Sequence, residues 1–155
     1  MNRLFMVFFV AMPFMATAQV NKDSLSAAAG VKNRNLQFDS IDLKIIQRAD
    51  VLLSDTSKWS KKDDRICEDD IANGRYSLFC ALYKASVDIA GSYEHRRAGM
   101  QQVRFILEKY ENGRVINHRL MDWNNHPDTK FEEVKKVLKE SLIAVESQLK
   151  QFINR

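Results

Sequence analysis

One short segment, Asp122–Thr129, gathers most of the side chains in this chain that could bind a partner. It contains an indole, two carboxamides and an imidazole, and it lies directly before a predicted helix N-terminus. Such an end carries unpaired N–H groups and a partial positive charge, which favour an anion. The same residue types also cap helices and form turns, and this structural role is the favoured interpretation. The candidate binding surface is Trp123, Asn124, Asn125 and His126.

Catalytic chemistry has two weaker candidates. A hydrolase could use Asp122 and His126, or carboxylates of the acidic loop Asp63–Asp70. However, the chain has no G-x-S-x-G elbow, no P-loop and no GxGxxG motif. Its three histidines lack the spacing of a metal site, and the acidic loop lacks the alternating ligands and central glycine of a calcium loop. We therefore expect no metal and no cofactor, assign no catalytic residue, and favour a non-enzymatic protein.

The two cysteines, Cys67 and Cys80, provide a structural expectation. An even number of cysteines in an exported chain favours a disulfide. This bond would close a loop of about 14 residues and stabilise the fold by about 3 kcal/mol. Two buried free thiols are the alternative.

The first eighteen residues have the order of a secretory signal peptide. Arg3 supplies positive charge, an apolar run follows, and the small residues Ala16-Thr17-Ala18 precede Gln19. The run is shorter than the roughly 20 residues that span a bilayer. We expect cleavage after Ala18 and a periplasmic or secreted protein. The alternative is an uncleaved segment that anchors the protein in the membrane.

Charge and composition favour a single helical domain that does not bind nucleic acid. The chain has 24 Lys plus Arg and 20 Asp plus Glu. The two signs are interspersed, as in Lys61-Lys62 before Asp63-Asp64, which is typical of solvated faces rather than of a phosphate-binding stripe. The predicted organisation is a signal peptide over 1–18, a flexible leader over 19–38 and a helical domain over 39–155.

Apolar residues recur at helical spacing in most of that domain. The pattern predicts an all-α bundle of about four helices, over about 40–54, 75–90, 93–111 and 129–153. Asp39 or Ser40 is the expected N-cap of the first helix, because short polar side chains accept a bond from the first free amides.

Two connecting segments complete this prediction. Residues 59–74 should form a loop with a short helical turn, pinned to the body by Trp59, Ile66 and Ile71. Residues 114–126 are ambiguous between a strand-like segment and a packed loop.

Two side-chain placements follow from the helix pattern. Thr129 and Glu132 should form a capping box at the start of the last helix. In the helix over 93–111, Arg104 falls outside the apolar stripe and should face solvent.

The segment from Ala49 to Leu142 resembles an uncharacterised family of small helical bacterial proteins. The matching residues are Trp59, Cys80-Ala81-Leu82, Trp123-Asn124 and the run Thr129-Lys130-Phe131-Glu132-Glu133-Val134. Asn125 stands where the family pattern has an aspartate. The resemblance implies a helical fold and carries no activity.

The expected function is a non-enzymatic binding module of the cell envelope, such as an immunity or inhibitor protein. Its expected partner is a protein or a peptide. The alternative is the envelope hydrolase described above.

Overall fold

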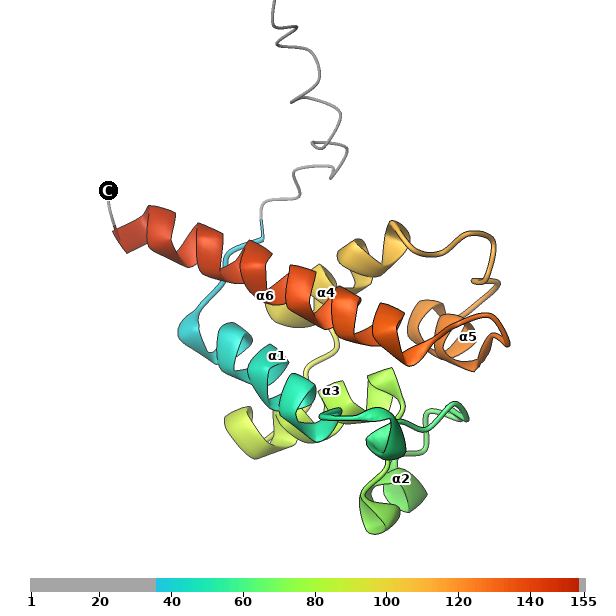
Figure 1. The fold of residues 1–155 in the computed structure, drawn as a ribbon. Coiled ribbons are helices and arrows are strands. Elements are labelled where there is room, and N and C mark those ends of the chain that lie inside the picture. Colours follow the sequence, from blue (N-terminus) through green and yellow to red (C-terminus); the bar gives the residue numbers. More distant parts are fainter. Residues whose placement is uncertain (1–35, 154–155) are drawn as a thin grey trace, which may run out of the picture. The chain divides into compact units, whose positions relative to one another are not determined.

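The computed structural model describes residues 36–153, and this part of the chain is helical, without strands (Figure 1). The all-α prediction is confirmed. The predicted signal peptide, its cleavage site and nearly all of the leader lie outside the described residues. The elements are α1 (Ser40–Leu52), η3 (Thr56–Lys58), α2 (Glu68–Asn73), α3 (Leu78–Ala90), α4 (Ala98–Glu108), α5 (Arg119–Asn125) and α6 (Phe131–Ile153).

Helix α1 begins where the sequence predicts, because Asp39 and Asp42 form a reciprocal capping box. The amide of Asp42 donates to Asp39 Oδ1 at 2.8 Å, and the amide of Asp39 donates to Asp42 Oδ2 at 3.0 Å. Two otherwise unpaired amides are thereby satisfied. The buried face of the helix carries Ile45, Ile46 and Ala49.

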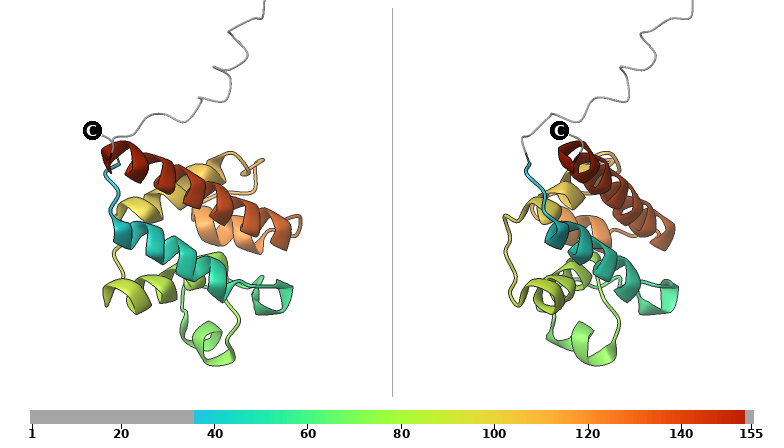
Figure 2. Two further views of the ribbon diagram at one scale, coloured as in Figure 1. Left: turned by 60° about the vertical axis from the view of Figure 1, so that its left-hand side comes forward. Right: turned by 90° about the vertical axis from the view of Figure 1, so that its left-hand side faces the viewer.

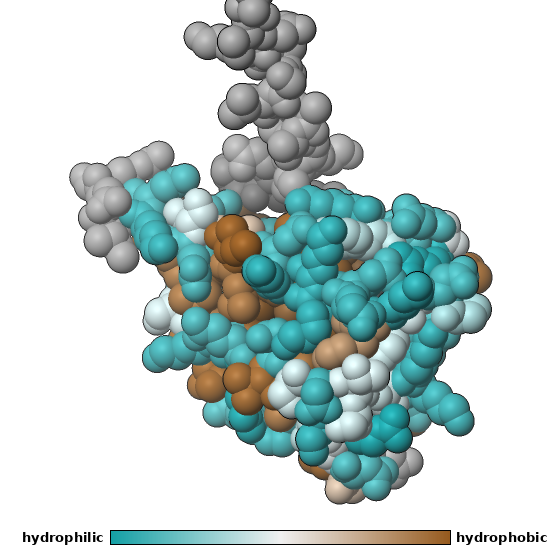
Figure 3. Space-filling view, in the orientation of Figure 1, coloured by the Kyte–Doolittle hydropathy of each residue, from teal (hydrophilic) through white to brown (hydrophobic). Residues whose placement is uncertain are grey.

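The core lies between α1, α3, α4 and α6. Helix α1 packs against both α3 and α6, and α4 packs against α6 (Figures 1 and 2). Helix α3 is buried or half-buried from Leu78 to Ser86, its last turn is exposed, and Gly91 ends it in the left-handed conformation at φ 76°. Hydrophilic side chains cover most of the face in Figure 3, with an apolar patch over α1 and the C-terminal half of α6. Among residues 36–153, no helix has the length and apolar character that crossing a membrane requires.

Residues 114–126 contain a helix, α5, which the sequence analysis did not predict. Its carboxylate Asp122 Oδ2 accepts the amides of Ile116, Asn117 and His118 at 2.9, 2.6 and 2.9 Å. Leu120 and Trp123, three residues apart, point into the core. The helix therefore depends on one local cap and on tertiary packing, and it is too short for a clear helical period.

Three boundaries also differ from the prediction. Helix α4 begins at Ala98 rather than near Tyr93, because Gln101 and Arg104 donate to the carbonyl of His95 and hold it in a loop. Helix α3 begins at Leu78 rather than Arg75. Leu36 and Phe38, assigned to the leader, pack against the core.

Three side-chain predictions were wrong. The Thr129 hydroxyl donates to the Trp123 carbonyl at 2.5 Å instead of capping α6, and Glu133 rather than Glu132 accepts the Lys130 amide. Ile66 is 62% exposed and does not pin its loop, whereas Trp59 is buried. Arg104 is only 9% exposed, although the helix pattern placed it outside.

Candidate functional site

A cationic cavity is the most chemically distinctive site in the described part of the chain. It has a volume of about 310 Å³ and opens to solvent between α3, α4 and α5. Its lining combines basic, aromatic and apolar side chains from the loops before α2, α4 and α5 and from these three helices. The lining residues are Arg65, Phe79, Tyr93, His95, Arg104, Asn117, His118, Arg119, Leu120 and Met121.

Two of the three arginines in this lining lack a carboxylate partner within residues 36–153. Arg119 is neutralised by Glu108 at 2.8 Å and by Glu111 at 2.6 Å. Arg65 and Arg104 have no such ion pair among the described residues. Arg104 is buried, and a buried cation is normally paired, whereas Arg65 is exposed at the opening. The cavity therefore has an excess of positive charge that an anion would balance.

The Arg104 guanidinium is fixed by neutral groups. Its Nη1 donates to the carbonyls of His95 and Met100, both at 3.1 Å. Its Nη2 lies 3.4 Å from the Tyr93 hydroxyl and 3.2 Å from His95 Nδ1. These contacts orient the guanidinium while leaving its charge uncompensated.

The positive charge of the cavity lowers the pKa of the His95 imidazole. The charge of Arg104 is the main cause that lowers the pKa of His95, with burial and the charges of Arg65 and Arg96 contributing. The neutral ring is favoured because each neighbouring cation opposes a further positive charge. An anion placed beside Arg104 would act in the opposite direction.

Arg65 is held in position by the loop that carries it. Its backbone adopts the left-handed conformation, with φ 65°, which is uncommon for a residue other than glycine. The Asp63 side chain supports it by accepting the Arg65 amide at 2.8 Å, and Asp64 accepts the next amide at 2.7 Å. The Arg65 Nη1 lies 3.3 Å from His118 Nε2 across the cavity.

Asn125 and Asn124, two residues of the predicted binding surface, attach this loop to α5. The Asn125 side chain accepts the Asp63 amide and donates to the Asp63 carbonyl, both at 2.7 Å. The fully buried Asn124 accepts Trp59 Nε1 at 2.9 Å and the Leu78 amide at 3.1 Å. It also donates to the Ser60 carbonyl at 3.0 Å. Both carboxamides therefore hold the segment from Trp59 to Asp63 against α5, and neither lines the cavity.

The other two residues of the predicted surface also have structural contacts. Trp123 is fully buried, and its indole N–H donates to the Tyr110 carbonyl at 3.0 Å. His126 is half-buried, and its Nδ1 accepts the Asp128 amide at 3.2 Å. Of the four residues, Asn125 and His126 have solvent-accessible surface, and none of the four lines the cavity.

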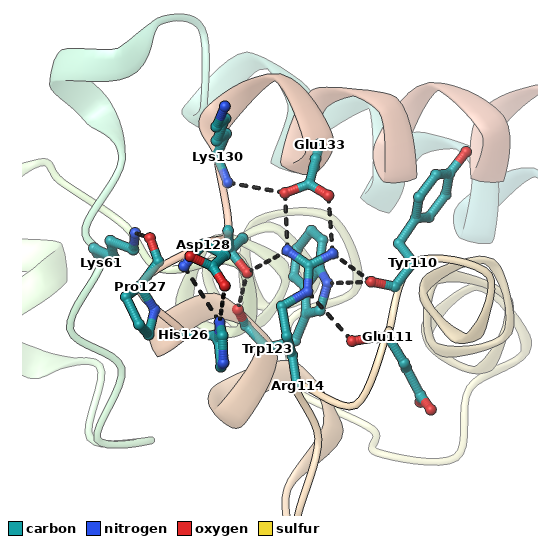
Figure 4. A network of polar contacts seen from close by, with 11 residues as sticks. Lys61, Tyr110, Glu111, Arg114, Trp123, His126, Pro127, Asp128, Lys130 and Glu133 are labelled. Carbon is teal, nitrogen blue, oxygen red and sulfur yellow. Dashed lines mark hydrogen bonds and ion pairs between the residues drawn. The ribbon is translucent and has the colours of Figure 1, made fainter.

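A buried arginine connects this region to α6 (Figure 4). Arg114 is 6% exposed and forms a bidentate ion pair with Glu133 at 2.8 and 2.9 Å. It also donates to Thr129 Oγ1 at 2.9 Å and lies over the Trp123 ring. Bidentate pairing is the strongest geometry for these groups, and the ion pair lowers the pKa of Glu133. This network fixes the segment from Arg114 to the start of α6.

The carboxylates proposed for catalysis accept hydrogen bonds from nearby backbone amides. The three amides that bond to Asp122, that of Asn117 foremost, hold the pKa of its carboxyl below the usual range. In the acidic loop, burial is the main cause that raises the pKa of Asp63 and of Asp70. Asp63 Oδ2 is buried and has no hydrogen-bond partner in the described structure. No group of three or more metal-ligating side chains occurs among the described residues.

The expected disulfide joins Cys67 to Cys80, with the Cα atoms 5.2 Å apart. It ties the start of α2 to α3, and so restrains the loop that carries Arg65. A disulfide of this kind is typical of proteins that fold in an oxidising compartment.

The cavity could not be found from the sequence because its arginines and histidines come from four separate segments. Arg65, His95, Arg104 and His118 share no motif or spacing. One signal was present, since Arg104 follows the buried Met100 by four residues and therefore shares its helix face.

Comparison with known proteins places the chain in a family but gives no activity. No curated protein and no solved structure matches it significantly. A family profile matches residues 39–141, a range that includes both cysteines and every residue lining the cavity. The chain belongs to DUF6197, a family of unknown function.

Proposed function

We propose that this protein is a non-enzymatic binding module, exported to the cell envelope, that receives an anionic group of a protein or peptide partner in the cationic cavity. The observation that carries this proposal is the pair of arginines, Arg65 and Arg104, without a carboxylate partner in the described structure. Anion recognition by arginine is strong because the guanidinium offers several N–H donors in a fixed plane.

The construction of the cavity supports ligand binding. Its walls are fixed by a disulfide, two buried or anchored carboxamides and the Asp122 carboxylate. Because these groups are already bonded, they preorganise the cavity for a ligand. The hydrolase hypothesis stays a prediction, and no observation of Asp122 or His126 favours it.

Export is the second part of the proposal. The order of residues in 1–18 supports it, and so does the disulfide. Intact mass of the protein expressed in its native host, with and without reduction and alkylation, tests it. We expect a chain that begins at Gln19 and is lighter by two hydrogens than the reduced form. A full-length chain with two free thiols would refute export.

Anion binding can be measured on the folded protein by NMR, with sodium acetate and inorganic phosphate as probes against sodium chloride at matched ionic strength. We expect saturable shifts of the His95 and His118 ring resonances and a rise in the pKa of His95, because a bound anion offsets the charge of Arg104.

A pair of arginine variants tests whether the effect is local. Arg65→Gln should abolish most of the shift, because it removes a cation from the cavity. Arg75→Gln is the matched control, since Arg75 is exposed, does not line the cavity, and is not among the charges that lower the pKa of His95. Equal responses in the two variants, or no saturable shift with either anion, would contradict the proposal.

A further inference from the structure

We infer that the cavity receives the C-terminal residue of a partner polypeptide, with the terminal carboxylate facing Arg65 and Arg104 and an apolar side chain on Phe79 and Met121. The inference rests on the proposed function and specifies its ligand.

The two chemical characters of the lining suggest this ligand. Arg65 and Arg104 provide positive charge, whereas Phe79 and Met121 provide apolar surface. Phe79 also stacks edge-on against Tyr93, with ring centroids 5.8 Å apart, so this part of the wall is aromatic. A ligand that satisfies the whole lining must bring a negative charge and an apolar group together.

The size of the cavity restricts how far apart these two groups can be. A volume of about 310 Å³ is at the lower end of the roughly 300–1,000 Å³ range for small-molecule sites. It therefore accommodates about one residue rather than a folded surface. In a polypeptide, the C-terminal residue carries a carboxylate and a side chain on the same carbon atom. The side chain of an internal aspartate or glutamate would supply the charge and leave the apolar wall unfilled.

Two exposed apolar residues that neighbour lining residues in the chain are available to contact the residues that precede such a terminus. Ile66, next to the lining residue Arg65, is 62% exposed, and Ile116, next to Asn117, is 84% exposed. We assign these two side chains to contacts with the partner, because each residue is bonded directly to one that lines the cavity. We expect the end of the partner chain to be apolar over its last few residues.

A set of three short peptides tests this inference by fluorescence anisotropy on the full chain. The first ends in Leu-Phe with a free carboxylate, the second is the same peptide with an amidated end, and the third is amidated but carries an internal glutamate. The free acid should bind about ten- to a hundredfold more tightly than either amidated peptide, because charge-assisted bonds to the carboxylate are lost. Similar affinity of any amidated peptide would overturn the inference.

Variants at the edge of the cavity separate this inference from the proposed function. Ile66→Ser and Ile116→Ser should weaken binding of the free acid but leave the acetate-induced shift of His95 unchanged. Val51→Ser is the control, because Val51 is 60% exposed on α1 and does not line the cavity. If acetate binds but the free-acid peptide does not, the inference fails and the proposed function stands. If neither binds, both fail.

Discussion

Replacing Asn124 by alanine should destabilise the protein severely. The carboxamide of Asn124 is fully buried and connects three segments, through Trp59 Nε1, the Leu78 amide and the Ser60 carbonyl. Asn124→Ala leaves the first two donors buried without an acceptor. Each orphaned donor costs about 1–3 kcal/mol, whereas the carbonyl of the half-buried Ser60 can be hydrated. The expected loss in the free energy of unfolding is therefore about 4 kcal/mol.

Urea unfolding followed by circular dichroism and tryptophan fluorescence measures this loss. A decrease of this size is a large part of the roughly 5–15 kcal/mol by which natural domains are stable. The matched control is Asn73→Ala, because Asn73 is exposed on α2 and should change stability by no more than about 0.5 kcal/mol. A loss below about 1 kcal/mol in Asn124→Ala, or one equal to the control, would refute the role assigned to this carboxamide.

Three further predictions concern the disulfide, Asp63 and Tyr110. Replacing Cys67 and Cys80 together by serine should lower the free energy of unfolding by about 3 kcal/mol, measured by urea unfolding, and reducing agent should then have no further effect. Burial raises the pKa of Asp63 in the folded state above 3.8. The protonated carboxyl therefore contributes stability that is fully present below pH 3.8 and is lost as pH rises through the folded-state pKa. Asp63→Asn should therefore be more stable than the wild type at neutral pH and lose this advantage below pH 3.8, and a pH-independent difference would contradict this assignment. Burial and the hydrogen bond to Glu140 raise the pKa of Tyr110 to about 12, so Tyr110→Phe should remove an ultraviolet absorbance transition near that pH.

Local sequence patterns were sufficient for the elements that are long or capped. The period of apolar residues located α1, α3, α4 and α6 to within a few residues at most ends. The Asp39 cap and the Gly91 terminus depend only on neighbouring residues, and both were predictable for that reason. The disulfide followed from the number of cysteines and the expected compartment.

The predicted binding surface shows the limit of such patterns. The segment from Asp122 to Thr129 was selected for its residue types, but a carboxamide can cap, bind a ligand or join two segments. The hydrogen-bond partners of a carboxamide decide which of these roles it has. The long-range partners of Asn124 and Asn125 lie 46 to 65 positions earlier in the chain. Composition therefore identified an important segment without revealing what it contacts.

The sequence by itself determined that this is a helical chain with a leader typical of export and a pair of cysteines suited to a disulfide. Only the tertiary structure brought Arg65, His95, Arg104 and His118 to one cavity. The physical reason is that helical periodicity, caps and turns arise from interactions between near neighbours. The cavity arises from the packing of α3, α4 and α5 and from loops held by long-range hydrogen bonds, which no local pattern encodes.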